Sequence, residues 1–171
     1  FRAVNGDLWA EYVDAGGIGN TVTLITSGTE SGDVIVDLVV TDEGITILSS
    51  GAIEELQFFQ MGEGGEVFQG DPDNDLEAKN IDLTAQDGIG TLEAIEINGT
   101  NLSAVTETGD IGIVDTDGGI HVTQAIVELD GSVDLTAQDG NLIVDEAQAA
   151  GEDTDVTLTQ TGEGDVLLGA V

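Results

Sequence analysis

The sequence predicts an all-β protein in which short parallel strands wind into a β-solenoid. A pattern of strand, acidic turn with Gly and second strand recurs along the 171 residues. Within the copies apolar residues alternate with polar ones, which is typical of half-buried strands. No segment shows a sustained 3.6-residue period with capping residues, so we expect almost no helix.

The spacing of the copies indicates a solenoid rather than a propeller. Copies begin at residues 36, 56, 81, 111, 133 and 156, in steps of 20, 25, 30, 22 and 23, and Leu-Thr-Ala-Gln-Asp-Gly occurs unchanged at 83–88 and 135–140. Periods of 20 to 50 residues mark repeat folds, and a propeller blade needs about 40. The sequence therefore predicts a parallel β-helix with about 20–25 residues per coil and roughly seven coils.

The alternation also predicts which side chains form the core. Three strands per coil fit this circumference, and 95–97, 102–105 and 125–129 are candidates for the third strand. The step of 30 residues predicts an extra loop between Thr91 and Thr108, and Gly after Asp is expected at corners that need positive φ. The residues expected to be buried are Ile81, Leu83, Ile111, Ile113, Val133, Leu135, Val156 and Leu158.

We expect one solenoid segment over residues 1–171, with irregular coils over 1–75 and clearer repeats over 76–171. The chain begins and ends within the pattern, which suggests a processed protein or an excerpt of a longer one. It contains no apolar run of the roughly 18 residues that a membrane span needs, so no membrane insertion is expected.

The net charge limits the kinds of molecule that this protein can bind. The 35 acidic residues against Arg2 and Lys79 give a formal net charge of −33. Such a surface repels nucleic acid and anionic membranes and attracts cations. We therefore expect salt or divalent ions to support folding, and a saline or calcium-rich extracellular setting. Cysteine is absent, which excludes disulfides, thiolate metal sites and a Cys nucleophile.

One segment has the composition of a calcium site, with carboxylates at alternate positions: Asp71, Asp73, Asp75 and Glu77. Calcium takes six to eight oxygen ligands, several of which such a loop can supply. It is not an EF-hand, because Leu76 stands where Gly is required and Asp82 where the twelfth-position Glu is required. A solvated acidic loop is the alternative interpretation.

No constellation for catalysis is found, so we expect no enzyme. His121 is the single histidine and has no supporting catalytic motif. A carbohydrate-active β-helix enzyme is the less favoured alternative: Arg2 and Lys79 are too few for a polyuronate lyase, and polygalacturonase signatures are missing. The sequons at Asn98 and Asn101 fall in the expected extra loop, where either surface glycosylation or chance occurrence explains them.

The repeats also resemble a known family. Residues 82–97, with Asp-Leu-Thr-Ala-Gln-Asp-Gly-Ile-Gly-Thr followed by Leu-Glu-Ala-Ile-Glu-Ile, and residues 108–122 are similar to repeats of filamentous-haemagglutinin-like bacterial surface proteins. The resemblance is best over 76–171. It implies a right-handed parallel β-helix, a place in an adhesin shaft on the cell surface, and flanking repeats as partners. The alternative is a small secreted subunit that polymerises end to end with identical copies into a filament.

Overall fold

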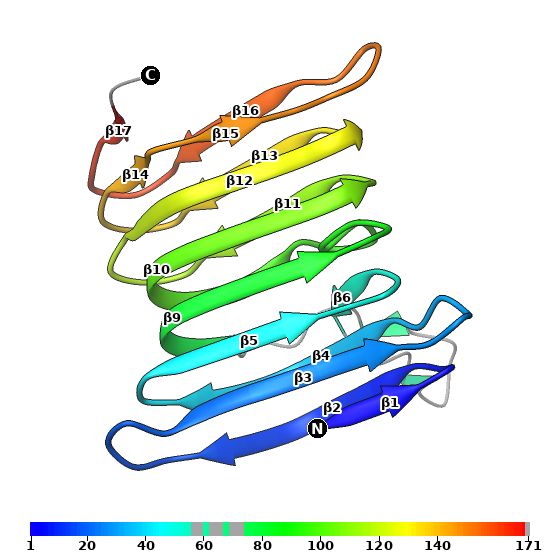
Figure 1. Cartoon of the computed structure of the whole chain (residues 1–171). Coiled ribbons are helices and arrows are strands. Elements are labelled where there is room, and N and C mark those ends of the chain that lie inside the picture. The colour runs from blue at the N-terminus through cyan, green and yellow to red at the C-terminus, as the bar shows by residue number, and fades with distance from the viewer. Residues whose placement is uncertain (56–59, 62–66, 69–73, 170–171) are drawn as a thin grey trace.

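The computed structural model describes residues 1–55, 60–61, 67–68 and 74–169. Within these residues the chain forms strands, turns and bends and no helix. Figure 1 shows successive coils stacked along one axis, and the strands of the sheet nearest the viewer run from left to right while the coils rise. The protein is therefore a right-handed parallel β-solenoid, which confirms the predicted fold class.

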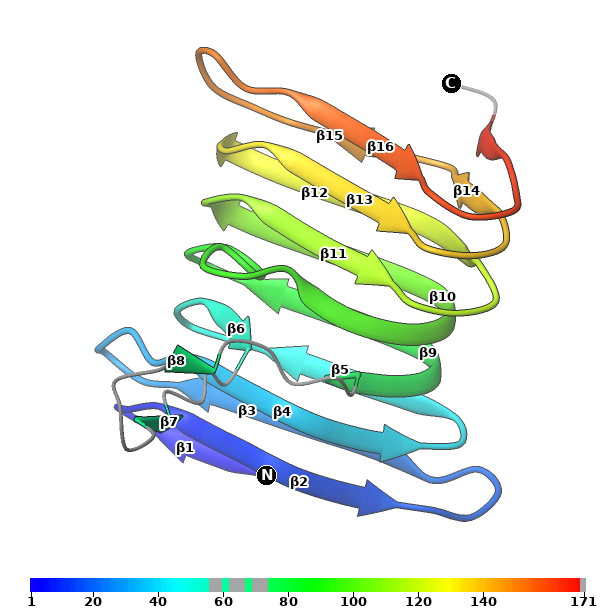
Figure 2. The ribbon, with the colours of Figure 1, turned by 180° about the vertical axis from the view of Figure 1, so that it is seen from behind.

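The coils are flattened into two faces of one continuous sheet. Face A lies nearest the viewer in Figure 1, and face B lies nearest in Figure 2. Face A contains β1 (Arg2–Val4), β3 (Thr21–Ser27), β5 (Gly44–Leu48), the second halves of β9 (Leu76–Ala85) and β10 (Ile95–Thr108), β12 (Ile120–Asp130), β14 (Leu142–Val144), β15 (Ala147–Gln148) and β17 (Val166–Leu168).

Face B contains β2 (Leu8–Ala15), β4 (Val34–Thr41), β6 (Ile53–Glu55), the first residues of β9 and β10, β11 (Ile111–Asp115), β13 (Val133–Ala137) and β16 (Val156–Gln160). All these pairs are parallel. A separate antiparallel pair, β7 (Gln60–Met61) with β8 (Val67–Phe68), belongs to the long connection between β6 and β9.

The register aligns one residue of each coil in a column through the molecule. On face B the first such column is Leu8, Val34, Ile53, Ile89, Ile111, Val133 and Val156. These seven levels confirm the predicted number of coils. At the roughly 4.8 Å spacing of neighbouring strands, seven levels correspond to about 34 Å along the axis. The long step from Ile53 to Ile89 contains the β7–β8 connection.

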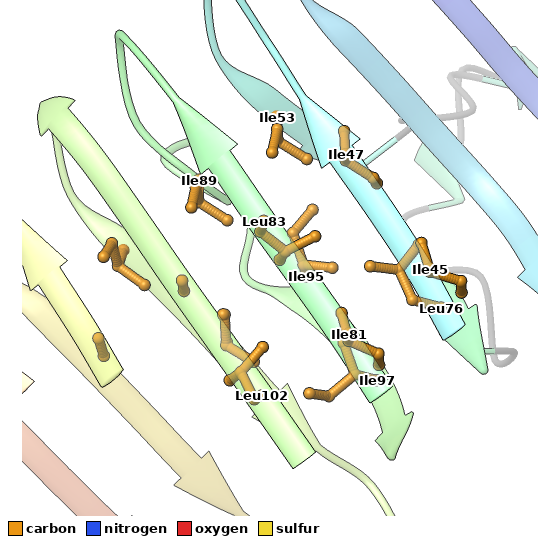
Figure 3. Close-up of a cluster of buried hydrophobic side chains, with 14 of the residues drawn as sticks. Ile45, Ile47, Ile53, Leu76, Ile81, Leu83, Ile89, Ile95, Ile97 and Leu102 are labelled. Carbon is orange, nitrogen blue, oxygen red and sulfur yellow. The ribbon is translucent and has the colours of Figure 1, made fainter. Parts of the chain in front are cut away.

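The core lies between the two faces and consists of Val, Ile, Leu and Ala in stacked columns. Figure 3 shows side chains from neighbouring coils, including Ile45, Ile81 and Leu102, meeting between the faces. Six of the eight residues expected to be buried are at most 3% exposed: Ile81, Leu83, Ile111, Ile113, Val133 and Leu135. The prediction was wrong for Val156, which is 42% exposed, and Leu158 is only partly buried, because no described coil covers them from above.

Glycine occupies the corners that the sequence predicted for it. Gly88 and Gly140 end the two copies of the repeated hexapeptide and have φ of +114° and +68°. A Cβ at Gly140 would lie 2.5 Å from the backbone of Gly118 in the neighbouring coil. Both the left-handed conformation and the close packing of corners therefore require glycine at this position.

The structure corrects the expected subdivision of a coil. Two faces replace three strands for most of the solenoid, because β10 and β12 are continuous strands of 14 and 11 residues. Among the coils that the structure describes, the one with β13, β14 and β15 alone is divided into three. The sequence could not show this, because a strand that bends around a corner keeps its alternating pattern on both sides of the bend.

The step of 30 residues has a different cause from the one expected. Ile81 lies on face A, where it pairs with Leu102, whereas Ile111 lies on face B, where it pairs with Val133. The step therefore covers a full coil and part of the next. Asn98 and Asn101 accordingly lie in β10 and not in a loop, and the Asn101 side-chain amide donates to Asn80 Oδ1 at 2.9 Å.

Replacing Leu83 by Ala tests the interior packing. Leu83 is 1% exposed in the middle of the stack, so the substitution should lower the free energy of unfolding by about 2–5 kcal/mol. Leu92→Ala is the matched control because Leu92 is 77% exposed, and its change should stay within about 0.5 kcal/mol. Urea denaturation followed by circular dichroism measures both. Equal effects of the two substitutions would contradict the assigned core.

Candidate functional site

A column of polar residues follows one corner of the solenoid and holds successive coils together. We define the corner column as the residues that directly precede the face B strands or bridge: Asp7, Asp33, Ala52, Gly88, Asp110, Ser132 and Asp155. At each level the amide after the column residue donates to the column carbonyl of the next coil, at 2.8–3.0 Å, from Leu8 N to Asp33 O up to Val133 N to Asp155 O. The backbone ladder thus continues past the strands.

Side chains of the corner column add a second bond between coils. The Asp7 carboxylate accepts from the Asp33 amide at 3.0 Å, and the Asp33 carboxylate accepts from the Ala52 amide at 2.9 Å. Asp110 accepts from the Ser132 amide at 2.8 Å, and the Ser132 hydroxyl accepts from the Asp155 amide at 3.2 Å. Each polar side chain therefore binds the backbone of the coil above it.

Two members of the column cannot make this bond. Ala52 and Gly88 carry no side-chain acceptor, and the Gly88 amide instead donates to the Thr106 hydroxyl oxygen at 3.0 Å. An amide–carboxylate bond is stronger than a neutral one, so an acidic residue is a favourable choice at the corner. Some of the acidic side chains of this protein thus form hydrogen bonds between coils. The sequence signal that could have revealed it is Asp directly before the strands at 8, 34, 111 and 156.

The predicted calcium residues are only partly within the described structure. Asp71 and Asp73 lie outside the described residues. Asp75 is 1% exposed and its carboxylate accepts from the Glu96 amide at 2.7 Å, while Glu77 accepts from the Asn74 side chain at 3.0 Å. Across the described part of the chain, no three metal-ligating side chains gather as an ion site. Calcium binding stays a prediction.

Burial changes the acidity of Asp75. Loss of solvent, and to a smaller extent the charges of Glu55, Glu96 and Asp37, raise the pKa of this carboxyl, whereas the hydrogen bond from the Glu96 amide lowers it. The net result is a pKa of about 8. Asp75 is thus protonated over much of the neutral range. Not every acidic side chain faces solvent: Asp75 and Asp115 are each 1% exposed, and Glu54 is 8% exposed.

Asp115 is a further buried carboxylate. It faces the interior at the end of β11, in the column between Ile97 and Ala137, and is 1% exposed. Neither carboxylate oxygen has a hydrogen-bond partner in the described structure, although the backbone amides of Gly99 and Gly119 are close enough to lower its pKa. Desolvation outweighs them, and together with the charge of Asp117 raises the pKa to about 6.

His121 forms a hydrogen bond and Lys79 an ion pair across coils. His121 Nε2 lies 2.8 Å from Asp145 Oδ2, and Lys79 Nζ lies 3.8 Å from Glu43 Oε1. Both His121 and Asp145 are partly solvent-exposed on face A, because His121 points outward between the buried Ile120 and Val122. The geometry assigns them to contacts between coils.

Comparisons with known proteins found no relative of this chain. No family model matches the sequence. No curated protein is significantly similar to it. No solved structure is significantly similar either. The resemblance to filamentous-haemagglutinin-like repeats therefore stays a prediction. Within the described residues no helix has the length and apolarity needed to cross a membrane.

The bond from the Asp33 carboxylate to the Ala52 amide can be tested by a pair of substitutions. Asp33→Ala leaves that amide without its acceptor and should lower the free energy of unfolding by about 1–3 kcal/mol. Asp33→Asn keeps an oxygen at the same place and should retain most of the stability, although the bond loses its charge. Urea denaturation compares the three proteins. If Asp33→Ala is as stable as Asp33→Asn, the corner column does not hold the coils.

Asp115 predicts a specific dependence of stability on pH. Its folded pKa of about 6 exceeds the ordinary aspartate pKa of 3.8, so the folded state holds the proton more tightly and stability falls as pH rises between these values. Asp115→Asn removes this loss. The variant should gain on the order of 2 kcal/mol over wild type near neutral pH and show much less gain near pH 4. Denaturant titrations at both pH values measure the difference, and a pH-independent difference would refute the assignment.

Proposed function

We propose that this chain is a structural segment of an extracellular fibre or adhesin shaft. One observation carries the proposal: every described coil pairs in parallel with the coil below it, both in the strands and through the backbone of the corner column. Such a stack transmits load along its axis through many parallel hydrogen bonds. Its natural partners are therefore flanking coils of the same kind.

The charge supports an extracellular setting and selects cations as partners. A net charge of −33 favours solubility and opposes side-by-side association of rods, nucleic acid binding and contact with anionic membranes. Acids concentrated on a thin rod also repel one another, and salt or divalent ions reduce this repulsion. Calcium is the ion that a protein exposed outside the cell meets at useful concentration, and carboxylates are its preferred ligands.

A structural role is favoured over catalysis. The single histidine is paired with Asp145, and the interior is filled with apolar side chains. The less favoured carbohydrate-active alternative would have to use the surface groove beside the bend at 90–94, where Glu93, Asp110 and Asp134 are present. These acids belong to a surface that is acidic throughout, so the groove does not single out a catalytic pair.

The second candidate is a small secreted subunit that polymerises end to end. The parallel pairing that joins coils within the chain fits the contact between stacked copies equally well. The mass of the intact native protein, measured from its source, separates the two candidates. A mass near 17.5 kDa supports the subunit, and a mass several times larger supports the shaft. An intracellular location of the native protein would contradict both.

Cation dependence of stability is a direct expectation of this proposal. Removing divalent ions with a chelator at low salt should lower the melting temperature, because crowded carboxylates repel and bound ions stabilise the folded state. At about 1 M NaCl the Debye length falls to about 3 Å and the difference should largely vanish. Thermal scans in both buffers, with and without calcium, provide the measurement. Identical curves in all conditions would contradict it.

A further inference from the structure

The outer side of face A carries very little charge in a chain that is otherwise strongly acidic. Three columns of outward residues run along it in register, from β3 through β5, β9 and β10 to β12. Asp82 is the only acidic member of these columns. We call this surface the neutral face and define it as Thr21, Gly44, Asn80, Asn101 and His121; Thr23, Thr46, Asp82, Ser103 and Gln124; and Ile25, Leu48, Thr84, Val105 and Ile126.

Acidic residues surround the neutral face instead of lying on it. Glu43, Glu107 and Glu128 stand at or beside the ends of its strands, and the outer side of face B carries Glu11 and Asp134. The side chains of the neutral face point away from the sheet, so coils added above or below would leave them exposed. The neutral face is therefore a distinct surface of the rod itself.

Hydrogen bonds along the axis hold polar side chains of the neutral face in place. The Asn101 amide donates to Asn80 Oδ1 at 2.9 Å, and the Gln124 amide donates to Ser103 Oγ at 2.9 Å. A surface that is ordered before binding loses little conformational entropy when a ligand arrives. The neutral face is thus suited to an extended, rigid ligand.

The charge of the molecule selects an uncharged ligand for this surface. A cationic partner would bind the acidic surfaces more strongly than the neutral face, and an anionic partner is repelled by the whole chain. A second copy would bring another net charge of −33, which disfavours pairing of two neutral faces. An uncharged ligand avoids this repulsion and, except at Asp82, requires no carboxylate to lose its water.

The spacing of the columns matches an extended sugar polymer. Successive coils place one member of each column about 4.8 Å apart along the axis, close to the length of one sugar ring in an extended chain. Two columns offer mainly hydroxyl and amide groups, which complement sugar hydroxyls. The third column offers Leu48, Val105 and Ile126, which can contact the apolar faces of the rings, and Leu48 is 40% exposed.

We propose that the neutral face binds an uncharged, extended polysaccharide whose chain lies along the solenoid axis, with about one sugar ring per coil. The inference rests on the proposed extracellular role and adds an adhesive surface to it. Each coil contributes a weak contact, and the contacts of successive coils act together because one polymer spans them all.

The two copies of the repeated hexapeptide supply a matched pair of variants. Thr84 and Thr136 occupy the same position of Leu-Thr-Ala-Gln-Asp-Gly, but Thr84 belongs to the neutral face and Thr136 to the outer side of face B. Thr84→Glu and Thr136→Glu therefore add the same charge in the same local sequence. Circular dichroism and urea denaturation first show that both variants remain folded.

Co-sedimentation with insoluble cellulose, chitin and mannan measures binding to uncharged polysaccharides. Wild type should bind at least one of them saturably, and Thr136→Glu should bind equally well. Thr84→Glu should bind about tenfold or more weakly, because its carboxylate would lose water without gaining a partner. Asp82→Asn removes the one acid of the neutral face and should bind at least as tightly as wild type.

Three results would overturn the inference. Failure of wild type to bind any of the polymers refutes a polysaccharide surface. Equal binding by Thr84→Glu and Thr136→Glu places the contact elsewhere on the molecule. Dimers of wild type in analytical ultracentrifugation that Thr84→Glu abolishes assign the neutral face to a second copy instead. Native mass and location test the shaft proposal separately, so its failure is distinguishable from each of these.

Discussion

The hydrogen bonds between coils are the interaction on which this structure depends. In a parallel stack each strand satisfies its backbone groups only through the strands above and below it, and a buried group without a partner costs roughly 1–3 kcal/mol. The corner column meets the same requirement beyond the strands. There the Asp33 carboxylate accepts a hydrogen bond from a backbone amide of the next coil that has no carbonyl acceptor. Apolar columns then fill the space between the faces.

The same constraint explains how a chain with a net charge of −33 folds. Outward positions keep carboxylates in water, and corner positions convert some of them into acceptors for backbone amides. Three buried carboxylates, Glu54, Asp75 and Asp115, depart from this arrangement. Asp75 and Asp115 are buried and have raised pKa values, so they cost stability wherever they must ionise. Because both are protonated more easily than exposed acids, the stack tolerates them best at lower pH.

Prediction from sequence succeeded where a feature repeats along the chain. Alternation at Ile81 and Leu83, and again at Val133 and Leu135, identified inward positions, and Gly after Asp identified corners with positive φ. It failed where two faces share one pattern: the identical hexapeptides at 83–88 and 135–140 begin on face A and on face B. The sequence predicted a site at the dense cluster Asp71–Glu77. It did not reveal the acids that join the coils, because these stand some 20 residues or more apart in the chain.

The sequence by itself determined the solenoid class, the number of coils and the interior columns, because period and alternation are local properties that every coil repeats. Only the tertiary structure decided that coils have two faces, that Asn98 and Asn101 lie within a strand, and that Asp7, Asp33 and Asp110 each bind the coil above. Those outcomes depend on which residues of successive coils lie over one another. That register is fixed by the geometry of the corners and by the close packing of neighbouring coils. Neither can be read from the sequence of a single coil.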